Sequence, residues 1–418
     1  MPCAAPRTLE ARTHLTNGLE LVPRLPEARD RAQHELRFSL ALGTVLMATQ
    51  GWGTPAVERV YLRARELCQQ LGDTPHLCLA LWGLIAGSVV RAELEKTRAL
   101  SQELLQLTQG QHDPVFRIAA HMELAGAAFG SGELTLAREH FEHSASLYDL
   151  TQHDAHVARV GTDLGIFCRI WATHVLWHLG YPDEARRRSQ ETLTLARELS
   201  HPFSQAIALA YAAMLHQFRR DLQTVHELAD ATLALSTEHG FKYYVAWARI
   251  IQGWVRVVQE HSAAGLEQIR EGIEALQATG GSVRCHYYRA LLAEAYGYIG
   301  QIDQESHALA EAFAAVQATG ECWWEAELHR LTGDLMLRQV PPDAQRAEVA
   351  FHQALAITRR QQARALELRA AMSLSRLWHQ QGKRAEARKL LAPIYNWFTE
   401  GFDTADLQEA QTLLQKLA

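Results

Sequence analysis

The chain has 418 residues and a net charge of −6 at pH 7, with 48% hydrophobic and 21% charged residues. This apolar fraction excludes an intrinsically disordered chain. Acidic and basic residues are mixed throughout, without the basic stripe typical of nucleic-acid binding. The N-terminus MPCAAPRTLEARTHL has no apolar signal region, and no uncharged apolar run approaches the ~20 residues that span a bilayer. We therefore expect a cytoplasmic protein with neither a nucleic-acid nor a membrane partner.

Along the chain, apolar residues recur with the i, i+3, i+4, i+7 spacing of amphipathic helices, and the alternating pattern of strands is absent. A stripe of small, large and small residues marks one helix in each unit. It is clear at Ala137, Phe141, Ser144; at Gly265, Ile269, Gly272; and at Ala347, Phe351, Ala354. Its first positions are Val57, Thr97, Ala137, Ala185, Val225, Gly265, Glu305, Ala347 and Ala387. Because most of these marker positions are 40 residues apart, the sequence predicts a helical repeat.

Each unit is predicted to be a helical hairpin whose apolar face is covered by its neighbours. About ten such hairpins would form an all-α, right-handed superhelical solenoid covering residues 1–418. We expect N-terminal units in residues 1–150 and an insertion loop at 151–162, where one unit is 48 residues long. C-terminal units and a capping helix would follow in residues 163–418. His153, Asp154 and His156 would lie exposed in the loop.

The stretch GELTLAREHFEHSASLYDL contains Glu139, His140, Glu142 and His143 within five residues, which suggests a metal or acid–base cluster. At helical spacing, however, three of the four point away from the buried stripe that begins at Ala137, and His140 lies at its edge. We expect a solvated surface there.

The stripes, together with preceding Leu-Ala pairs such as Leu124-Ala125 and Leu292-Ala293, resemble the tetratricopeptide repeat, in the long-unit form of MalT-type regulators. Segments including RARELCQQLGDTP and RRQQARALELRAAMSLSRLWHQQGKRAEARKLLAPIYNWFTEGFDTADLQEAQTLLQKL are similar to a bacterial family. In that family a C-terminal repeat region follows a STAND-type ATPase and an adenylate/guanylate cyclase domain. The resemblance implies a sensor or scaffold arm whose partners include upstream ATPase or cyclase domains. Neither catalytic domain is present here, so we expect a fragment, a split gene product or a free-standing relative.

No catalytic motif is complete. The only Gly-Lys pair, Gly382-Lys383, lacks the first glycine and the Ser/Thr of a phosphate-binding loop, and no HExxH or zinc-type spacing occurs. His174 and His178 have i, i+4 spacing and could face one ion. They support the alternative of a metal-dependent enzyme, although packing histidines are the simpler interpretation. We expect no enzyme activity, cofactor or metal.

The main hypothesis is a non-catalytic interaction or sensor module in bacterial signalling. It would bind a peptide, a partner domain or a small signal on its concave face, and a purely structural spacer is a further alternative. The resemblance implies that the groove is lined from the first helix of each hairpin. The groove residues are then Phe167, His174, Trp177, His178, Met214, Phe218, Trp247, Trp254, Tyr287, Tyr298, Arg330 and Arg338. Aromatic residues with adjacent arginines are typical of binding hot spots.

Overall fold

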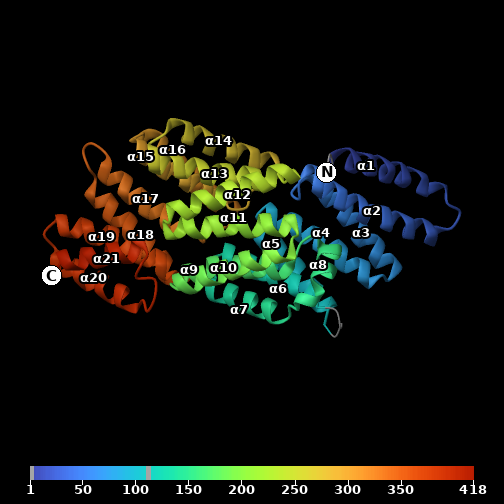
Figure 1. Cartoon of the computed structure of the whole chain (residues 1–418), viewed down its shortest axis with the longest axis horizontal. Coiled ribbons are helices and arrows are strands. Elements are labelled where there is room, and N and C mark those ends of the chain that lie inside the picture. Colours follow the sequence, from blue (N-terminus) through green and yellow to red (C-terminus); the bar gives the residue numbers. More distant parts are fainter. Residues whose placement is uncertain (1–3, 110–113) are drawn as a thin grey trace.

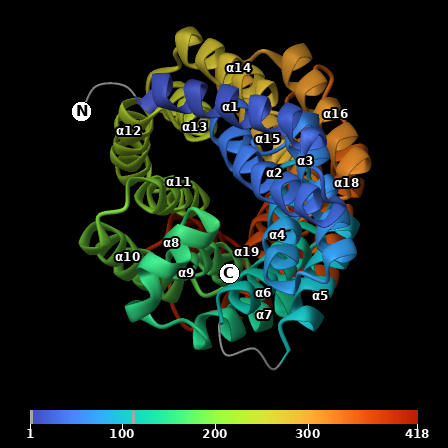
Figure 2. The ribbon, with the colours of Figure 1, turned by 90° about the vertical axis from the view of Figure 1, so that its right-hand side faces the viewer.

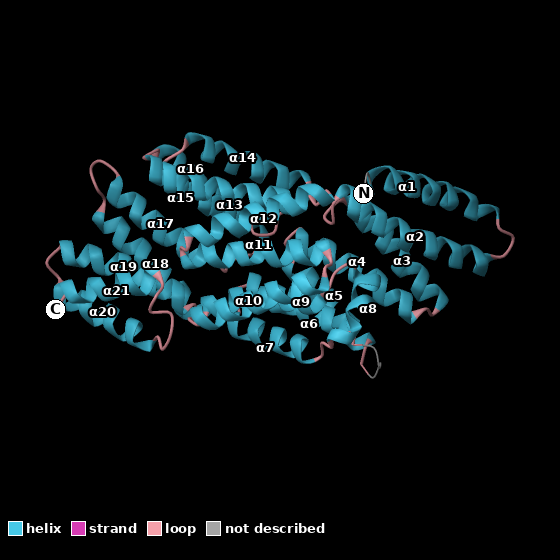
Figure 3. Ribbon diagram, in the orientation of Figure 1, coloured by secondary structure: helices cyan, strands magenta, loops and turns pink. Residues whose placement is uncertain are grey.

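The computed structural model describes residues 4–109 and 114–418, and this part of the chain is all-α (Figure 3). Its helices are α1 (Ala4–Leu21), α2 (Ala28–Gln50), α3 (Pro55–Leu71), α4 (Thr74–Val90), α5 (Leu94–Leu107), α6 (Val115–Gly130), α7 (Leu134–Ser146), α8 (His153–Val160), α9 (Leu164–His178), α10 (Pro182–Leu199), α11 (Pro202–Arg219), α12 (Leu222–His239), α13 (Lys242–Glu260), α14 (Ala263–Ala278), α15 (Cys285–Ile299), α16 (Ile302–Thr319), α17 (Glu325–Arg338), α18 (Ala344–Gln361), α19 (Arg364–Gln380), α20 (Arg384–Trp397) and α21 (Ala405–Lys416). Two short 3-10 helices, Val22–Arg24 and Leu150–Gln152, complete the list. None of these helices is long and apolar enough to cross a bilayer.

Consecutive helices pair as hairpins that stack into a superhelix (Figure 1). The pairs are α2/α3, α4/α5, α6/α7, α9/α10, α11/α12, α13/α14, α15/α16, α17/α18 and α19/α20. Viewed down the long axis, α4, α6, α9, α11 and α19 lie nearest the centre, and α5, α7, α10, α12, α14, α16 and α18 surround them (Figure 2). In the hairpins α4/α5, α6/α7, α9/α10 and α11/α12, the first helix is therefore an inner helix and the second is an outer helix. The α-helical hairpin repeat predicted from the sequence is confirmed.

The marker positions explain why the hairpins close tightly. All nine are buried, including the polar Thr97 and Glu305. The backbones of α13 and α14 approach each other closely. A Cβ atom added at Gly253 would lie 2.7 Å from the Gly265 carbonyl oxygen, and one added at Gly265 would lie 2.7 Å from the Gly253 carbonyl oxygen. Small residues at these crossings thus let one helix backbone pack against the next.

The segment expected to be an insertion loop is different in the structure. Residues 153–160 form the short helix α8, and His156 is buried against the Tyr148 ring, so the expectation of an exposed loop is wrong. The buried carboxylate of Asp163 organises this region. It accepts hydrogen bonds from Tyr148 Oη, His153 Nδ1 and the Ile166 backbone N–H, each at 2.7 Å. Tyr148, His153 and Ile166 are close to Asp163 in sequence, but none of them is a marker position of the repeat.

Later hairpins rest directly on earlier ones. The Ser282 and Val283 amides donate to the Val90 carbonyl at 2.8 and 3.0 Å, and the Cys322 amide donates to the Gly130 carbonyl at 2.8 Å. Near the C-terminus, Glu400 accepts from the backbone amides of Asp183 and Glu184 across a separation of 217 and 216 residues. Successive turns of the superhelix are therefore in contact at these three places.

We predict that Ala137→Leu and Ala347→Leu each overpack a hairpin crossing. Both alanines are fully buried, so the added methyl groups have no space, and the cost should be about 1–3 kcal/mol in the free energy of unfolding. Thermal melts followed by circular dichroism measure the effect. Val349→Leu, at an exposed site on the same helix as Ala347, serves as the control. Unchanged melting in both buried variants would contradict the register.

Candidate functional site

The structure buries most of the residues predicted to line a groove. Eight of the twelve are at most 2% exposed: His174, Trp177, His178, Met214, Phe218, Trp247, Trp254 and Tyr287. Phe167 and Arg330 are half-buried, whereas Tyr298 and Arg338 are exposed. For the eight buried side chains, the expectation of an open groove is wrong. Substitution of buried residues such as Trp177 or Trp254 would therefore disturb packing.

The inner face is closed by aromatic residues that come from a later turn of the superhelix. Trp323 and Trp324 precede α17 and pack against α9 and α11: the Phe218 and Trp324 rings are 5.1 Å apart, and the His178 and Trp323 rings are 5.7 Å apart. The Arg369 guanidinium lies 5.0 Å from the Trp177 ring and also donates to the Phe218 carbonyl. Chain segments 151 residues apart in sequence thus fill what would otherwise be a channel.

His174 and His178 do not form a metal site. His174 Nε2 donates to the Tyr211 carbonyl, and His178 Nδ1 donates to the His174 carbonyl, both at 2.8 Å. Both side chains are fully buried, and this desolvation lowers each pKa to about 3. They are neutral packing residues, so the sequence-based alternative of an enzyme built on this pair loses its support.

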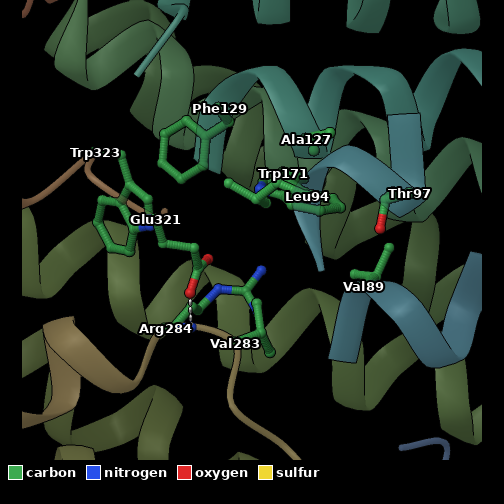
Figure 4. Close-up of a pocket in the computed structure, with 11 residues that line it drawn as sticks. Val89, Leu94, Thr97, Ala127, Phe129, Trp171, Val283, Arg284, Glu321 and Trp323 are labelled. Atoms are coloured by element: carbon green, nitrogen blue, oxygen red, sulfur yellow. Dashed lines mark hydrogen bonds between the residues drawn. The ribbon is translucent and has the colours of Figure 1, made fainter. Parts of the chain in front are cut away.

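A second buried feature surrounds Arg284, at the start of α15 (Figure 4). Its guanidinium lies between the rings of Trp171, Tyr211 and Trp247, at 5.4, 4.9 and 5.0 Å, and donates to Tyr211 Oη. Its backbone amide donates to Glu321 Oε2 at 2.7 Å. An adjoining cavity of about 20 Å³ has space for one water molecule but not for an organic ligand. We interpret Arg284 and the rings around it as part of the packing that closes the inner face.

Glu123, on α6, is a buried carboxyl group on which the charge of Arg284 acts. It is 3% exposed, its Oε2 has no hydrogen-bond partner, and desolvation raises its pKa to about 8 even though Arg284 acts in the opposite direction. Burial likewise raises the pKa of Glu321 to about 7. The closed interior therefore holds carboxyl groups that prefer the protonated form.

Charged side chains form a continuous ladder where α11, α17, α19 and α21 meet. In order, its members are Arg376, Glu409, Arg220, Asp406, Arg369, Glu327, Arg330 and Asp334. Arg330 and Asp334 are in the closest contact, and the other nitrogen–oxygen distances along the ladder run from 2.8 Å for Arg376–Glu409 to 3.7 Å for Arg369–Glu327. We refer to these eight residues as the charged ladder.

The middle of the charged ladder is buried, and the end formed by Arg376, Glu409 and Arg220 is open to solvent. The side chains of Arg369 and Glu327 are 9% and 6% exposed, whereas those of Arg220 and Arg376 are 41% and 46% exposed. Tyr298 on α15 is 41% exposed. Partial burial and the carboxylates of Glu294 and Glu409 raise the pKa of its phenol, and the arginines Arg220 and Arg330 act in the opposite direction. Tyr298 and the open end of the ladder form the candidate functional site.

Sequence reasoning found only part of this site. Tyr298, Arg330 and Arg338 were identified by their position on an inner helix. Arg220, Arg376 and Glu409 were missed, because the Arg220–Asp406 bond joins residues 186 apart and forms only when the superhelix closes. Arg338 lies at the edge, where it pairs with the buried marker residue Glu305 and donates from Nε to the Asp334 carbonyl at 3.3 Å.

A separate open groove of about 550 Å³ lies near the N-terminus, between α1 and α3 over α2. Its floor includes Leu46 and Val60, and Arg59 and Arg63 stand at the α3 edge. Arg63 is already paired with Glu35 at 2.6 Å. This groove lies outside the inner-face positions and is a second location to be tested.

No protein-family model matches the chain. A stretch of 343 residues is 23% identical to an uncharacterized protein of Rhizobium meliloti (strain 1021), covering 79% of this chain and 32% of that protein. The chain thus spans about a third of the length of this curated relative.

Two solved structures share the fold over nearly their whole length. One is a Rap protein complexed with competence and sporulation factor, with a TM-score of 0.55 and 11% identity, covering 92% of this chain and 99% of that chain. The other is the Rap conjugation gene regulator of plasmid pLS20 in complex with the Phr* peptide, with a TM-score of 0.51 and 11% identity, covering 85% and 96%. The chain has the superhelical, tetratricopeptide-like fold of these proteins.

We predict that Glu123→Gln flattens the dependence of stability on pH. A carboxyl whose pKa is raised on folding stabilises the folded state most fully below its unfolded pKa of about 4.5, and this contribution is lost as pH rises toward about 8. Wild type should therefore lose stability between pH 5 and pH 8 relative to the variant. Denaturant unfolding at several pH values measures it, with Glu139→Gln, at an exposed position, as the control. Parallel pH profiles for wild type and Glu123→Gln would contradict the prediction.

Proposed function

We propose that the chain is a non-catalytic binding arm that captures a carboxylate-bearing polypeptide segment at Tyr298 and the open end of the charged ladder. The observation that carries the proposal is the half-exposed pair Arg220 and Arg376, which share Glu409 beside an exposed tyrosine. Elsewhere on the inner face, the predicted contact residues are mostly buried by the chain itself. The open end is therefore the accessible part of the predicted surface.

The chemistry of the two arginines favours an anionic partner. Arg376 contacts Glu409 through Nη2, and Arg220 reaches both Asp406 and Glu409 through Nη1. A guanidinium has five N–H donors. Arg220 and Arg376 can therefore each donate to a further carboxylate without giving up their existing bonds. Tyr298 supplies a flat apolar surface with a polar end, as hot-spot tyrosines do.

We further propose that the arm acts in bacterial signalling as part of a longer protein. The similarity to the repeat regions of STAND-type ATPase and cyclase fusion proteins supports this, as does the much greater length of the Rhizobium relative. The two Rap structures, one complexed with competence and sporulation factor and the other with the Phr* peptide, support a binding role for this fold. The bound segment would then come from an upstream domain or from a separate regulator.

Selection from a phage-displayed library of random peptides tests the proposal with purified full-length chain. Peptides rich in Asp and Glu should be enriched. We predict that Tyr298→Ala and Arg376→Glu each weaken binding of the enriched peptide by about 2 kcal/mol or more, the threshold for a hot spot. The Arg376→Glu loss should shrink as salt rises, because screening weakens the wild-type attraction.

Two variants locate the effect. Arg187→Glu makes the same charge change on the outer helix α10, where the arginine is 56% exposed and paired with Glu184 and Glu191, and it should bind like wild type. Arg59→Glu tests the N-terminal groove. Binding lost in Arg59→Glu but kept in Tyr298→Ala would move the site to that groove. No enriched peptide at all would favour the spacer interpretation.

A further inference from the structure

Three histidines lie together on the hairpin of α6 and α7, away from the charged ladder. His121 comes from α6, and His140 and His143 come from α7. The Nδ1 atoms of His121 and His140 are 3.0 Å apart, and the rings of His121 and His143 are centred 4.2 Å apart. The sequence pattern placed His140 and His143 on a solvated surface, and His121, 19 residues earlier, did not enter that interpretation.

The geometry of the first two imidazoles is close to that of a chelating pair. In the hydrogen bond between them, one Nδ1 donates and the other accepts. When both rings carry their proton on Nε2 instead, two Nδ1 lone pairs face each other. Nitrogen ligands about 2.0–2.1 Å from a tetrahedral Zn²⁺ ion are roughly 3.3 Å apart. The two nitrogens, now 3.0 Å apart, need to separate only slightly to hold such an ion.

His143 can complete the site by a side-chain rotation. Among the residues that the structure describes, no group of three or more donor side chains is already arranged around a metal position. The third imidazole therefore has to turn inward as the ion binds. His143 is exposed and already in ring contact with His121, so this rotation moves it over a short distance and displaces no buried group.

The surroundings keep the imidazoles available to a cation. Desolvation, with further contributions from His143, His140 and Arg117, lowers the pKa of His121 to about 4, and desolvation also lowers that of His140. The cations Arg117 and Arg98 oppose a metal ion, and the carboxylate of Glu139 acts in its favour.

We propose that His121, His140 and His143 bind a divalent transition-metal ion such as Zn²⁺, which joins α6 to α7. Imidazole ligands select zinc, copper or nickel over magnesium or calcium. The site is independent of the proposed partner surface, since none of its residues belongs to the charged ladder.

Isothermal titration of ZnCl₂ into the untagged full-length protein at pH 7.5 tests this site. We expect one ion per chain, with affinity lowered at least about tenfold in His121→Ala and in His140→Ala, and to a smaller extent in His143→Ala. MgCl₂ should give no binding, because imidazole ligands select transition-metal ions over magnesium. Circular dichroism melts without metal show whether each variant is folded.

His307→Ala is the matched control. That side chain is 79% exposed on the outer helix α16 and has a carboxylate neighbour, Glu311 at 3.4 Å, but no second imidazole in contact. It should bind zinc like wild type. Zinc affinity unchanged in folded His121→Ala and His140→Ala would place the ion elsewhere and overturn the proposal, as would the absence of any zinc binding by the wild-type chain.

Discussion

The close approach of two helices at one buried position in each hairpin is the constraint on which the rest of the structure depends. At Gly253 and Gly265 the backbones come so near that a single Cβ atom would clash with a carbonyl oxygen. Where the marker residue is larger or charged, the cost is met locally: the buried carboxylate of Glu305 pairs with Arg338 of the following hairpin. Because each crossing fixes how one hairpin sits on the next, the small rotation between units accumulates along the chain. The pitch of the superhelix is therefore set by many local contacts.

That accumulated rotation brings distant segments together, and the resulting contacts determine what the inner face can do. Trp323 and Trp324 fill the interior beside α9 and α11, and the Arg284 and Arg369 guanidinium groups lie against the aromatic rings. Burying a guanidinium is costly unless its donors are used, and here they reach Tyr211 Oη, the Phe218 carbonyl and Asp406. The closed interior is thus a polar and aromatic core, and a partner can reach only its ends and edges.

The sequence predicts the repeat well and the closure poorly, for a physical reason. Marker residues such as Ala137 and Ala347 report contacts within a hairpin or between neighbours, which depend on local periodicity alone. The bond between Arg220 and Asp406 depends on the summed geometry of every unit between them, and an error of a few degrees per hairpin would separate the two side chains. The same reason explains why the aromatic residues of the inner helices were predicted to line a groove. Their position on the helix was correctly inferred, but the side chains that cover them come from a later superhelical turn. His121, His140 and His143 are an intermediate case. Their helices α6 and α7 are adjacent in sequence, but residue spacing does not predict that the imidazole rings face each other.

The buried middle and the exposed Arg376 end of the charged ladder differ in what they can contribute to folding. Its buried members, Arg369 and Glu327, are 9% and 6% exposed, and removing either would leave a charge without compensation in the interior. The pairs of Arg220 and Arg376 with Glu409 are well solvated, and exposed ion pairs contribute only about 0–1 kcal/mol each. Holding the fold together therefore accounts for the buried middle of the ladder but for little of its exposed end. There Arg220 contacts Asp406 and Glu409, and Arg376 contacts Glu409, so each guanidinium has further N–H donors to offer beside the exposed Tyr298. These donors support the proposed binding surface over the spacer alternative.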